Sequence, residues 1–312
     1  MALKAAVIGV GHLGQHHARI YSQVEGVDLV GVVDPRPDQG KEVARRVDSQ
    51  WFQSLDDLFA FTDSLDIASV VVPTVAHFEV AQKLLNKKVH LLIEKPVTAS
   101  LEQAQELERL ADEKGAIVAV GHVEQFNPPM RELRGLAPQP LLIRTRREGL
   151  YTGRIADVGV VLDLMIHDLE LICSLINAPV ASIQALRQAF HGENEDTAMA
   201  QLTFASGANA QLFCSRVSHH KNRVMEVICE DKTYELDLGA GTLTLWHAKH
   251  DPVTGLQQGT SRQVSLEAAE PLKAEIEHFI DCVRHGKRPL VALEDGTRAL
   301  SLALKILDCS NK

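Results

Sequence analysis

The sequence is poor in aromatic residues, has no long hydrophobic run and carries no excess of positive charge. Aromatic residues make up 4% of the 312, which argues against a lectin or a single-strand nucleic-acid surface built on stacked rings. Lys and Arg number 32 against 41 Asp and Glu, and this net charge of −9 argues against a partner such as duplex nucleic acid. Because no apolar stretch reaches about 18 residues and no basic segment precedes one, we expect neither a membrane span nor a signal peptide.

Cysteine is scarce and scattered, with no Cys-x-x-Cys pair. The five cysteines are Cys173, Cys214, Cys229, Cys282 and Cys309. An odd and widely spaced set predicts reduced thiols in a cytoplasmic protein and argues against a disulfide framework or a zinc site. The length predicts about two domains, and the 45% hydrophobic and 23% charged residues are typical of a globular chain.

The first 120 residues alternate short β-branched runs with helical segments. The expected strands are 3–9, 27–33, 67–72, 89–93 and 117–120. Expected helices include 77–86 and 100–114, where Ser100 can cap the start and Gly115 can end the helix. Nearly continuous apolar strands alternating with helices predict an α/β fold with a doubly wound parallel sheet, a Rossmann domain.

The pattern changes after Gly121. Four prolines punctuate the next segment, namely Pro128, Pro129, Pro138 and Pro140. The elements expected beyond them are a helix over 158–176, strands over 182–190, 198–204, 208–217 and 223–229, and helices over 267–285 and 293–307. We therefore predict a dinucleotide-binding domain over 1–121 and, over 122–312, an α+β domain with a large, mostly antiparallel open sheet.

A Gly-x-Gly-x-x-Gly run follows the first expected strand and precedes a helix. Gly9 permits the tight turn, Gly11 lets the backbone approach a pyrophosphate, and Gly14 lets the helix pack closely on the strand. Asp34 lies twenty positions beyond Gly14, where its carboxylate can bind the ribose hydroxyls of NAD and repel a 2′-phosphate. NADP remains an alternative, because Arg36 could stack on adenine or hold that phosphate.

Histidines at the turn invite a metal interpretation, which we reject. His12 and His16 are four residues apart, but no carboxylate or thiol lies nearby in sequence to complete a site. We therefore predict that the protein holds no metal.

Two groups of residues carry the expected chemistry. Glu94-Lys95-Pro96 follows the strand 89–93 at the carboxyl edge of the sheet, where a lysine can hydrogen-bond or protonate a reacting oxygen. Asp163 and His167 share one face of an apolar helix, so the carboxylate can orient the imidazole. The alternatives, a solvated lysine and a buried structural pair, stay open at this point.

These residues resemble the glucose-fructose oxidoreductase, inositol dehydrogenase and rhizopine-catabolism (Gfo/Idh/MocA) superfamily from end to end. The matching motifs are Gly9-x-Gly11-x-x-Gly14-x-x-His17, Pro73-Thr74 with His77, Glu94-Lys95-Pro96, Asp163-x-x-x-His167, 279–289 and Glu294-Asp295-Gly296. The resemblance implies a Rossmann domain, an α/β domain whose open sheet builds homodimers or homotetramers, and reversible hydride transfer between a sugar or cyclitol carbinol and a nicotinamide.

The resemblance also implies roles for individual residues. Lys95, Asp163 and His167 would surround the reacting hydroxyl, with His167 as general base, Lys95 polarising the oxygen and Asp163 orienting them. The cofactor would be bound by the glycine turn and its neighbours, namely Gly9, Gly11, His12, Leu13, Gly14, Asp34, Arg36, Pro73, Thr74, His77, Glu94 and Lys95.

One subgroup is more similar, on the residues 121–128 and 157–168: the UDP-N-acetylglucosamine 3-dehydrogenases, which prepare a 3-keto sugar for an aminotransferase in routes to the diamino sugars of lipid A. Arginines cluster over 144–154 and suit a diphosphate, although each could equally lie on a solvated strand face; they are Arg144, Arg146, Arg147 and Arg154. The expected substrate contacts are Lys95, Asn127, Arg147, Arg154, Asp163 and His167. Two alternatives remain, a dehydrogenase of a free sugar or inositol and a non-catalytic nucleotide sensor.

Overall fold

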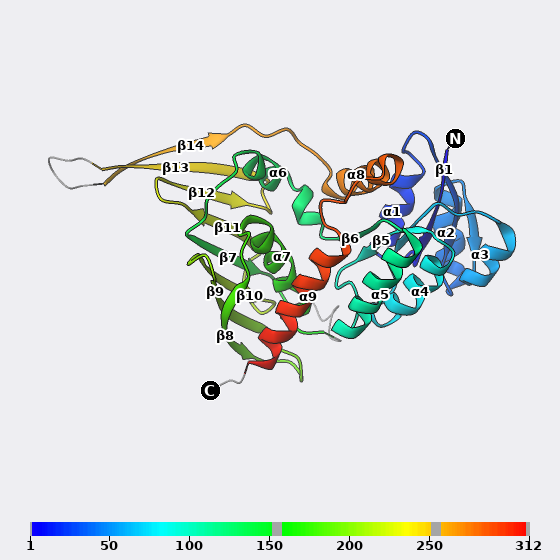
Figure 1. Ribbon diagram of the computed structural model, residues 1–312, viewed down its shortest axis with the longest axis horizontal. Helices are drawn as coiled ribbons and strands as arrows, with labels where there is room; N and C mark the ends of the chain where they lie inside the picture. Colours follow the sequence, from blue (N-terminus) through cyan, green and yellow to red (C-terminus); the bar gives the residue numbers. More distant parts are fainter. Residues whose placement is uncertain (1, 152–157, 251–256, 310–312) are drawn as a thin grey trace. The chain divides into compact units, whose positions relative to one another are not determined.

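The computed structural model describes residues 2–151, 158–250 and 257–309, which form two compact units (Figure 1). The first unit comprises Met1–Val123 and Leu272–Thr297, and the second comprises Glu124–Pro271 and Arg298–Lys312. The sequence predicted one division, at residues 121 and 122, and placed the whole C-terminal stretch in the second domain. The stretch Leu272–Thr297 instead groups with the first unit, because Ile276, Phe279 and Ile280 pack into its core.

The first unit is built on a six-stranded parallel sheet in the order β3-β2-β1-β4-β5-β6. Its strands are β1 (Leu3–Ile8), β2 (Val27–Val33), β3 (Gln50–Phe52), β4 (Ile67–Val70), β5 (His90–Glu94) and β6 (Val118–Gly121). Its helices are α1 (Gly14–Tyr21), α2 (Pro37–Arg46), α3 (Leu55–Phe61), α4 (Thr74–Asn86), α5 (Leu101–Lys114) and α8 (Pro271–His285). The predicted Rossmann domain is confirmed.

Local sequence explains where these elements begin and end. The amide of Gln103 donates to Ser100 Oγ (3.4 Å) at the start of α5, and Gly115 ends that helix in the left-handed region with φ of 63°. The strand β3 was not predicted, because three residues carry too short a pattern to detect. No helix in the described part of the chain is long and apolar enough to cross a bilayer.

The second unit is built on an eight-stranded sheet in the order β14-β13-β12-β11-β7-β10-β9-β8. Its strands are β7 (Leu142–Glu148), β8 (Val180–Gln188), β9 (Thr197–Phe204), β10 (Asn209–Ser215), β11 (Asn222–Ile228), β12 (Lys232–Asp237), β13 (Thr242–His250) and β14 (Gln257–Val264). The β7–β10 pair is parallel and the other neighbours are antiparallel, so the predicted mostly antiparallel sheet is confirmed.

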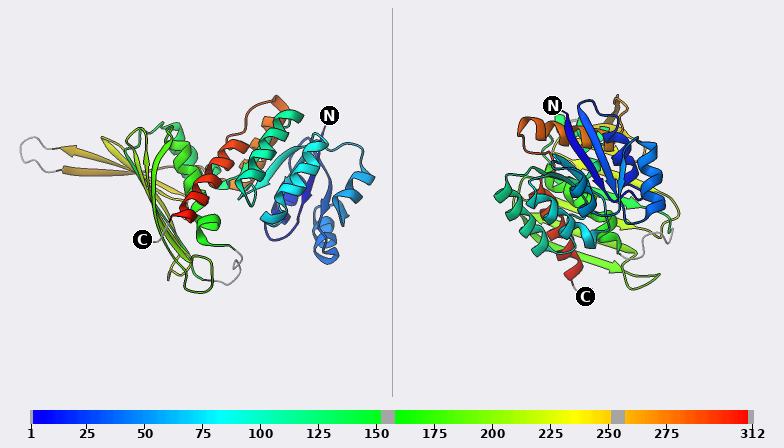
Figure 2. Two further views of the ribbon diagram at one scale, coloured as in Figure 1. Left: turned by 60° about the horizontal axis from the view of Figure 1, so that its bottom comes forward. Right: turned by 90° about the vertical axis from the view of Figure 1, so that its right-hand side faces the viewer.

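Helices cover one face of this sheet (Figures 1 and 2). They are η1 (Val123–Phe126), α6 (Pro128–Gly135), η2 (Val161–Met165), α7 (Ile166–Leu175) and α9 (Leu293–Asp308), of which α9 begins within the first unit. Side chains of α6, α7 and α9 pack with the inward-facing strand residues in one core. The opposite face of the strands carries exposed side chains, including Met199 and Trp246.

Candidate active site

The glycine turn after β1 has the geometry expected of a phosphate-binding loop. Gly9 adopts φ of 86°, and a Cβ there would lie 2.5 Å from the carbonyl oxygen of Val71. A Cβ on Gly14 would lie 1.9 Å from the Gly9 carbonyl oxygen, so α1 starts against the turn. At Gly11 a Cβ would meet only Arg36 Nη2, at 3.7 Å, so the backbone there is open to a ligand.

Sheet topology places this turn where ligands bind in doubly wound folds. The chain runs from β1 outward to β3 and returns to β4 on the other side of β1, so the topological switch point lies between β1 and β4. Gly9 follows β1, and Pro73 precedes α4, which begins at Thr74 after β4. His12 and Leu13 are exposed on the turn itself. The structure therefore brings these predicted cofactor residues to one edge of the sheet.

Asp34 lies at the end of β2 and is held by a set of hydrogen bonds. Its buried carboxylate accepts from the amide of Val10 (3.1 Å) and from the amide, Nε and Nη2 of Arg36 (3.0 Å each). Burial alone raises the pKa of Asp34, but the hydrogen bonds from Arg36 and Val10 outweigh it and hold the pKa below its ordinary value. The carboxylate is thus ionised and fixed beside the glycine turn.

These observations fit a dinucleotide. The open backbone at Gly11 and the uncapped N-terminus of α1, which has no acidic residue in its first turn, suit a pyrophosphate. The ionised Asp34 suits two ribose hydroxyls.

Lys95 follows β5 and is half-buried. Its amide donates to Glu94 Oε2 (3.3 Å), and the bond between Lys95 and Pro96 is cis. The two ring nitrogens of His77 lie 2.9 Å from the carbonyl oxygens of Pro96 and Val72. His77 is buried, and burial lowers its pKa. Both polar atoms of His77 therefore face backbone of the protein, a geometry that suits holding the Lys95-Pro96 turn rather than the predicted cofactor contact.

A buried polar network lies beneath that turn. His17 Nε2 is 3.2 Å from Glu94 Oε1, and His17 Nδ1 is 3.0 Å from Ser69 Oγ, which also contacts the hydroxyl of Tyr21. A Cβ on Gly121 would lie 2.7 Å from Glu94 Oε1, so the glycine makes room for the carboxylate. The network joins α1, which follows the glycine turn, to the residue that precedes Lys95.

His122 was not predicted as a site residue, and the structure places it beside Lys95. It follows β6 and is 1% exposed. Burial, and secondarily the positive charge of Lys95, lower the pKa of His122 to about 3. The imidazole is therefore neutral at physiological pH.

Asp163 and His167 belong to the second unit and are half-buried. The sequence predicted one α-helix over 158–176, but Asp163 lies in the π-helical turn η2 and His167 is the second residue of α7. Val161 and Met165 pack into the core beneath them. Single π turns inside helices are frequent at functional sites. The π turn lies at Asp163, one of the residues predicted to take part in catalysis.

Arg147 does not fit the predicted role as a diphosphate ligand. It is 3% exposed, and it donates to Asp168 Oδ1 (2.8 and 3.1 Å) and to Glu124 Oε1 (2.8 Å). Asn127 is also buried and donates to Glu124 Oε2 and to the carbonyl of Leu238 (3.0 Å each). Both side chains therefore bind groups inside the second unit: the Arg147 guanidinium pairs with the buried carboxylates of Asp168 and Glu124, and the Asn127 amide donates to Glu124.

The other clustered arginines do not join Arg147. Successive residues of a strand point to opposite faces, so Arg144 and Arg146 of β7 lie on the open face of the sheet. Arg144 pairs with Glu226 (2.7 Å) and Arg146 with Glu148 (2.9 Å). Arg154 lies outside the described residues. The prediction of one cationic patch over 144–154 is therefore wrong for its described members.

Sequence reasoning missed the partners that hold the predicted residues in place. His17 is part of the motif that matches the family. Its position on the buried side of α1, among Ala18, Ile20 and Tyr21, is the signal that could have given it a role. Glu195, which accepts from the amide of Val161 (3.0 Å), comes from another loop 34 residues away, and nothing local marks it.

Comparisons with known proteins agree with this geometry. Residues 3–122 match the Gfo/Idh/MocA oxidoreductase family with its NAD-binding Rossmann fold, and residues 131–235 match that family's C-terminal domain. The UDP-N-acetylglucosamine 3-dehydrogenase of Acidithiobacillus ferrooxidans is 33% identical over 97% of this chain and 96% of its own length. The crystal structure of that enzyme superposes with a TM-score of 0.92, at 32% identity, over 98% of this chain and 96% of that one.

A second relative acts on a cyclitol. The NAD-dependent scyllo-inositol 2-dehydrogenase of Bacillus subtilis is 27% identical over 97% of this chain and 92% of its own length. Two domains of one family thus cover most of the chain, in the order that the structure shows. The protein is therefore an NAD-binding oxidoreductase of the Gfo/Idh/MocA family.

Proposed function

We propose that the protein oxidises the 3-hydroxyl of UDP-N-acetylglucosamine to the 3-keto sugar, with NAD as the hydride acceptor. The observation that carries the proposal is the end-to-end likeness to the Acidithiobacillus enzyme of that activity, in sequence and in fold. The product ketone is the kind of substrate that an aminotransferase takes, and we place the reaction in a route to the diamino sugars of lipid A.

The residues at the sheet edge would hold the cofactor. The backbone from Gly9 to Gly14 would bind the pyrophosphate, and Asp34 would accept hydrogen bonds from the adenosine ribose. When bound, NAD accepts the hydride that leaves the carbinol carbon. Glu94 and His77 hold the turn that presents Lys95.

The chain's own residues would manage the proton. His167 takes the hydroxyl proton as general base while the C–H pair leaves as hydride, so the products are a ketone, NADH and one proton. Lys95 polarises the reacting oxygen through its ammonium, and Asp163 orients the imidazole.

Oxidation of a free sugar or an inositol is the second candidate. The Bacillus relative of that activity favours it, and the same three residues would serve. The engagement of Arg147 inside the fold also removes one reason for requiring a diphosphate. A non-catalytic sensor would need neither Lys95 nor His167.

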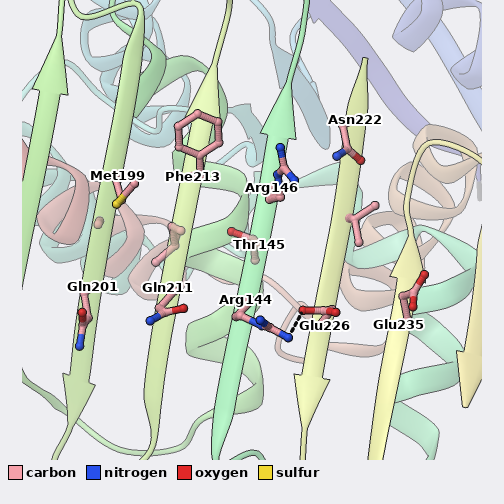
Figure 3. Close-up of a pocket in the computed structure, with 13 residues that line it drawn as sticks. Arg144, Thr145, Arg146, Met199, Gln201, Gln211, Phe213, Asn222, Glu226 and Glu235 are labelled. Atoms are coloured by element: carbon pink, nitrogen blue, oxygen red, sulfur yellow. Dashed lines mark ion pairs between the residues drawn. The ribbon is translucent and has the colours of Figure 1, made fainter. Parts of the chain in front are cut away.

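We further propose that the open face of the second sheet pairs with a second copy of the chain. A hollow of about 590 Å³ lies on this face between Met199, Phe213, Arg144 and Glu226 (Figure 3). Exposed apolar side chains on the same sheet include Leu186, Met199 and Trp246. Apolar patches on a sheet face rimmed by charges are typical of subunit interfaces.

A reducing compartment, the cytoplasm, suits the cysteines. All five are free thiols in the structure, and Cys214, Cys229 and Cys282 are buried.

The decisive experiment measures NADH formation by absorbance across UDP-sugars, free hexoses and inositols. A ketone trap or a partner aminotransferase is included, because the equilibrium can favour the alcohol. We expect the signal from UDP-N-acetylglucosamine; turnover of myo-inositol with none of that sugar nucleotide would select the second candidate. Lys95→Ala and His167→Ala should each lower kcat by about 10²-fold or more, and near-full turnover in either variant would remove its assigned role.

A further inference from the structure

The start of the π-helical turn η2, which contains Asp163, contacts a loop from another part of the second unit. Glu195, between β8 and β9, accepts a hydrogen bond from the amide of Val161 through its carboxylate (Oε1, 3.0 Å). Its own carbonyl oxygen accepts from the amide of Val160 (3.0 Å). The amide groups in the first turn of a helix have no intrahelical acceptors. Glu195 supplies acceptors for two of these amides, those of Val160 and Val161.

Gly159 makes this approach sterically feasible. A Cβ built on Gly159 would lie 2.0 Å from the carboxyl carbon and Oε1 of Glu195. Any larger residue would therefore displace the carboxylate or the backbone that it holds. Gly159 and Glu195 therefore depend on each other: the contact of Glu195 with the Val161 amide requires a glycine at position 159, although the two residues are far apart in the sequence.

Arg216 fastens the same loop to the end of β10. Its Nε donates to Asp196 Oδ1 (2.6 Å) and its Nη1 donates to the carbonyl of Val158 (2.8 Å). Asp196 is fully buried and also accepts from the amides of Phe190 and His191 (2.6 and 2.7 Å). The loop is thus fixed at several points and can act as a rigid support.

We propose that Glu195 is a positioning residue for the acid–base pair Asp163 and His167. The inference rests on the catalytic roles proposed above. Asp163 lies two residues beyond Val161, inside the π-helical turn η2, and its own amide donates to the carbonyl of Gly159 (3.1 Å). The negative charge of Glu195 lies at the start of this helical segment, where it interacts favourably with the helix dipole and strengthens the hydrogen bond from the Val161 amide. Loss of the contact lets the turn shift, and a displacement of about 1 Å at catalytic groups costs on the order of 10²-fold in rate.

Four variants and one control variant test the proposal by kcat. Glu195→Ala and Gly159→Ala should each lower kcat by about 10- to 100-fold while the affinity for NAD stays within about twofold. Glu195→Gln keeps an oxygen acceptor for the Val161 amide and should retain most of kcat. The double variant Gly159→Ala/Glu195→Ala should be no worse than the worse single variant, because both changes remove one contact. Glu193→Ala, an exposed acid of the same loop, is the control.

Hydrogen–deuterium exchange supplies a readout that needs no substrate. The peptide covering 158–168 should exchange faster in Glu195→Ala and Gly159→Ala than in the wild type, Glu195→Gln or the control. The kcat comparison uses whichever sugar the wild type oxidises, so failure of UDP-N-acetylglucosamine refutes the proposed substrate and leaves this test intact. Unchanged exchange, wild-type kcat in Glu195→Ala, or additive losses in the double variant would each overturn the proposal.

Discussion

Arg36 and Asp34 form a two-pronged ion pair at the end of β2, with Nε and Nη2 each 3.0 Å from a carboxylate oxygen. The acid is buried, whereas the arginine side chain is 63% exposed. The cation that could bind a 2′-phosphate is therefore engaged by the carboxylate that repels one. From this pairing we expect Asp34 to control the choice between NAD and NADP.

We predict that Asp34→Ser raises the preference for NADP. The change removes the repelling carboxylate and releases the Arg36 guanidinium, and a charge-assisted hydrogen bond is worth about 1.5–3 kcal/mol. The ratio of kcat/KM for NADP to that for NAD should rise by about tenfold or more, measured by steady-state kinetics. The double variant Asp34→Ser/Arg36→Ala should lose the gain, and an unchanged ratio in Asp34→Ser contradicts the role of the acid.

We predict that Gly121→Ala disrupts the network beneath Lys95. The new methyl group would lie 2.7 Å from Glu94 Oε1 and would push the carboxylate away from His17. Overpacking of this kind costs about 1–3 kcal/mol of unfolding free energy, and kcat should fall because Lys95 is held through Glu94. Urea denaturation and NADH formation measure both effects. Gly135→Ala is the control, because its Cβ would meet no heavy atom within 4 Å; equal effects in the two variants would contradict the prediction.

The first unit was largely predictable because its signals are local. Apolar runs gave β1, β2, β4, β5 and β6 within one or two residues, and the glycine turn and Ser100 cap follow from short-range sterics and hydrogen bonds. The environment of Lys95 was not predictable. The parallel sheet brings His77, His122 and Gly121 close to Glu94-Lys95-Pro96. Their separation in the sequence does not indicate that they are close in space.

In the second unit, the clustering of arginines in the sequence led to a wrong prediction, that of one cationic patch. Arg146 and Arg147 are neighbours in the sequence, but the alternation of β7 sends one to the open face and the other into the core. The strand β7 itself was not predicted, because its alternation is between arginines and buried residues that include Thr145 and Arg147, so the period-two apolar signal is weak. The contact of Glu195 with Val161 depends wholly on the tertiary fold.

We predict that Arg147→Met strongly destabilises the second unit. The variant removes the buried cation shared by Glu124 and Asp168 and leaves Glu124 with the more distant Arg223 (3.7 Å). Breaking such a buried pair costs about 3–5 kcal/mol. Arg144→Met is the control, since both side chains of its pair with Glu226 are solvent-accessible and such a pair is worth about 0–1 kcal/mol. Urea denaturation compares the two. Full stability of Arg147→Met together with a salt-dependent loss of substrate affinity would restore Arg147 as a diphosphate ligand.

We predict that charges on the open sheet face dissociate the proposed oligomer. Met199→Glu combined with Trp246→Glu places carboxylates among exposed apolar side chains, which a second copy would have to desolvate. Analytical ultracentrifugation should show an oligomer for the wild type and a monomer for the double variant. Leu136→Glu, an exposed leucine after α6, should leave the oligomer intact. A monomeric wild type would refute the proposed pairing.

We predict a loss of stability on acidification that originates at His122. Its pKa in the folded protein is lowered to about 3, whereas an unfolded histidine has a pKa of about 6.5. The unfolded chain therefore binds the additional proton, so this contribution is fully present above pH 6.5 and declines as the pH falls from there toward 3, by about 1.4 kcal/mol per pH unit. His122→Asn and His122→Phe cannot titrate, and their free energies of unfolding in urea should fall less steeply between pH 6.5 and 5 than that of the wild type. His77, whose pKa is also lowered, leaves a residual slope in every variant. Identical slopes in the wild type and both variants would mean that His122 is not held neutral in the folded protein.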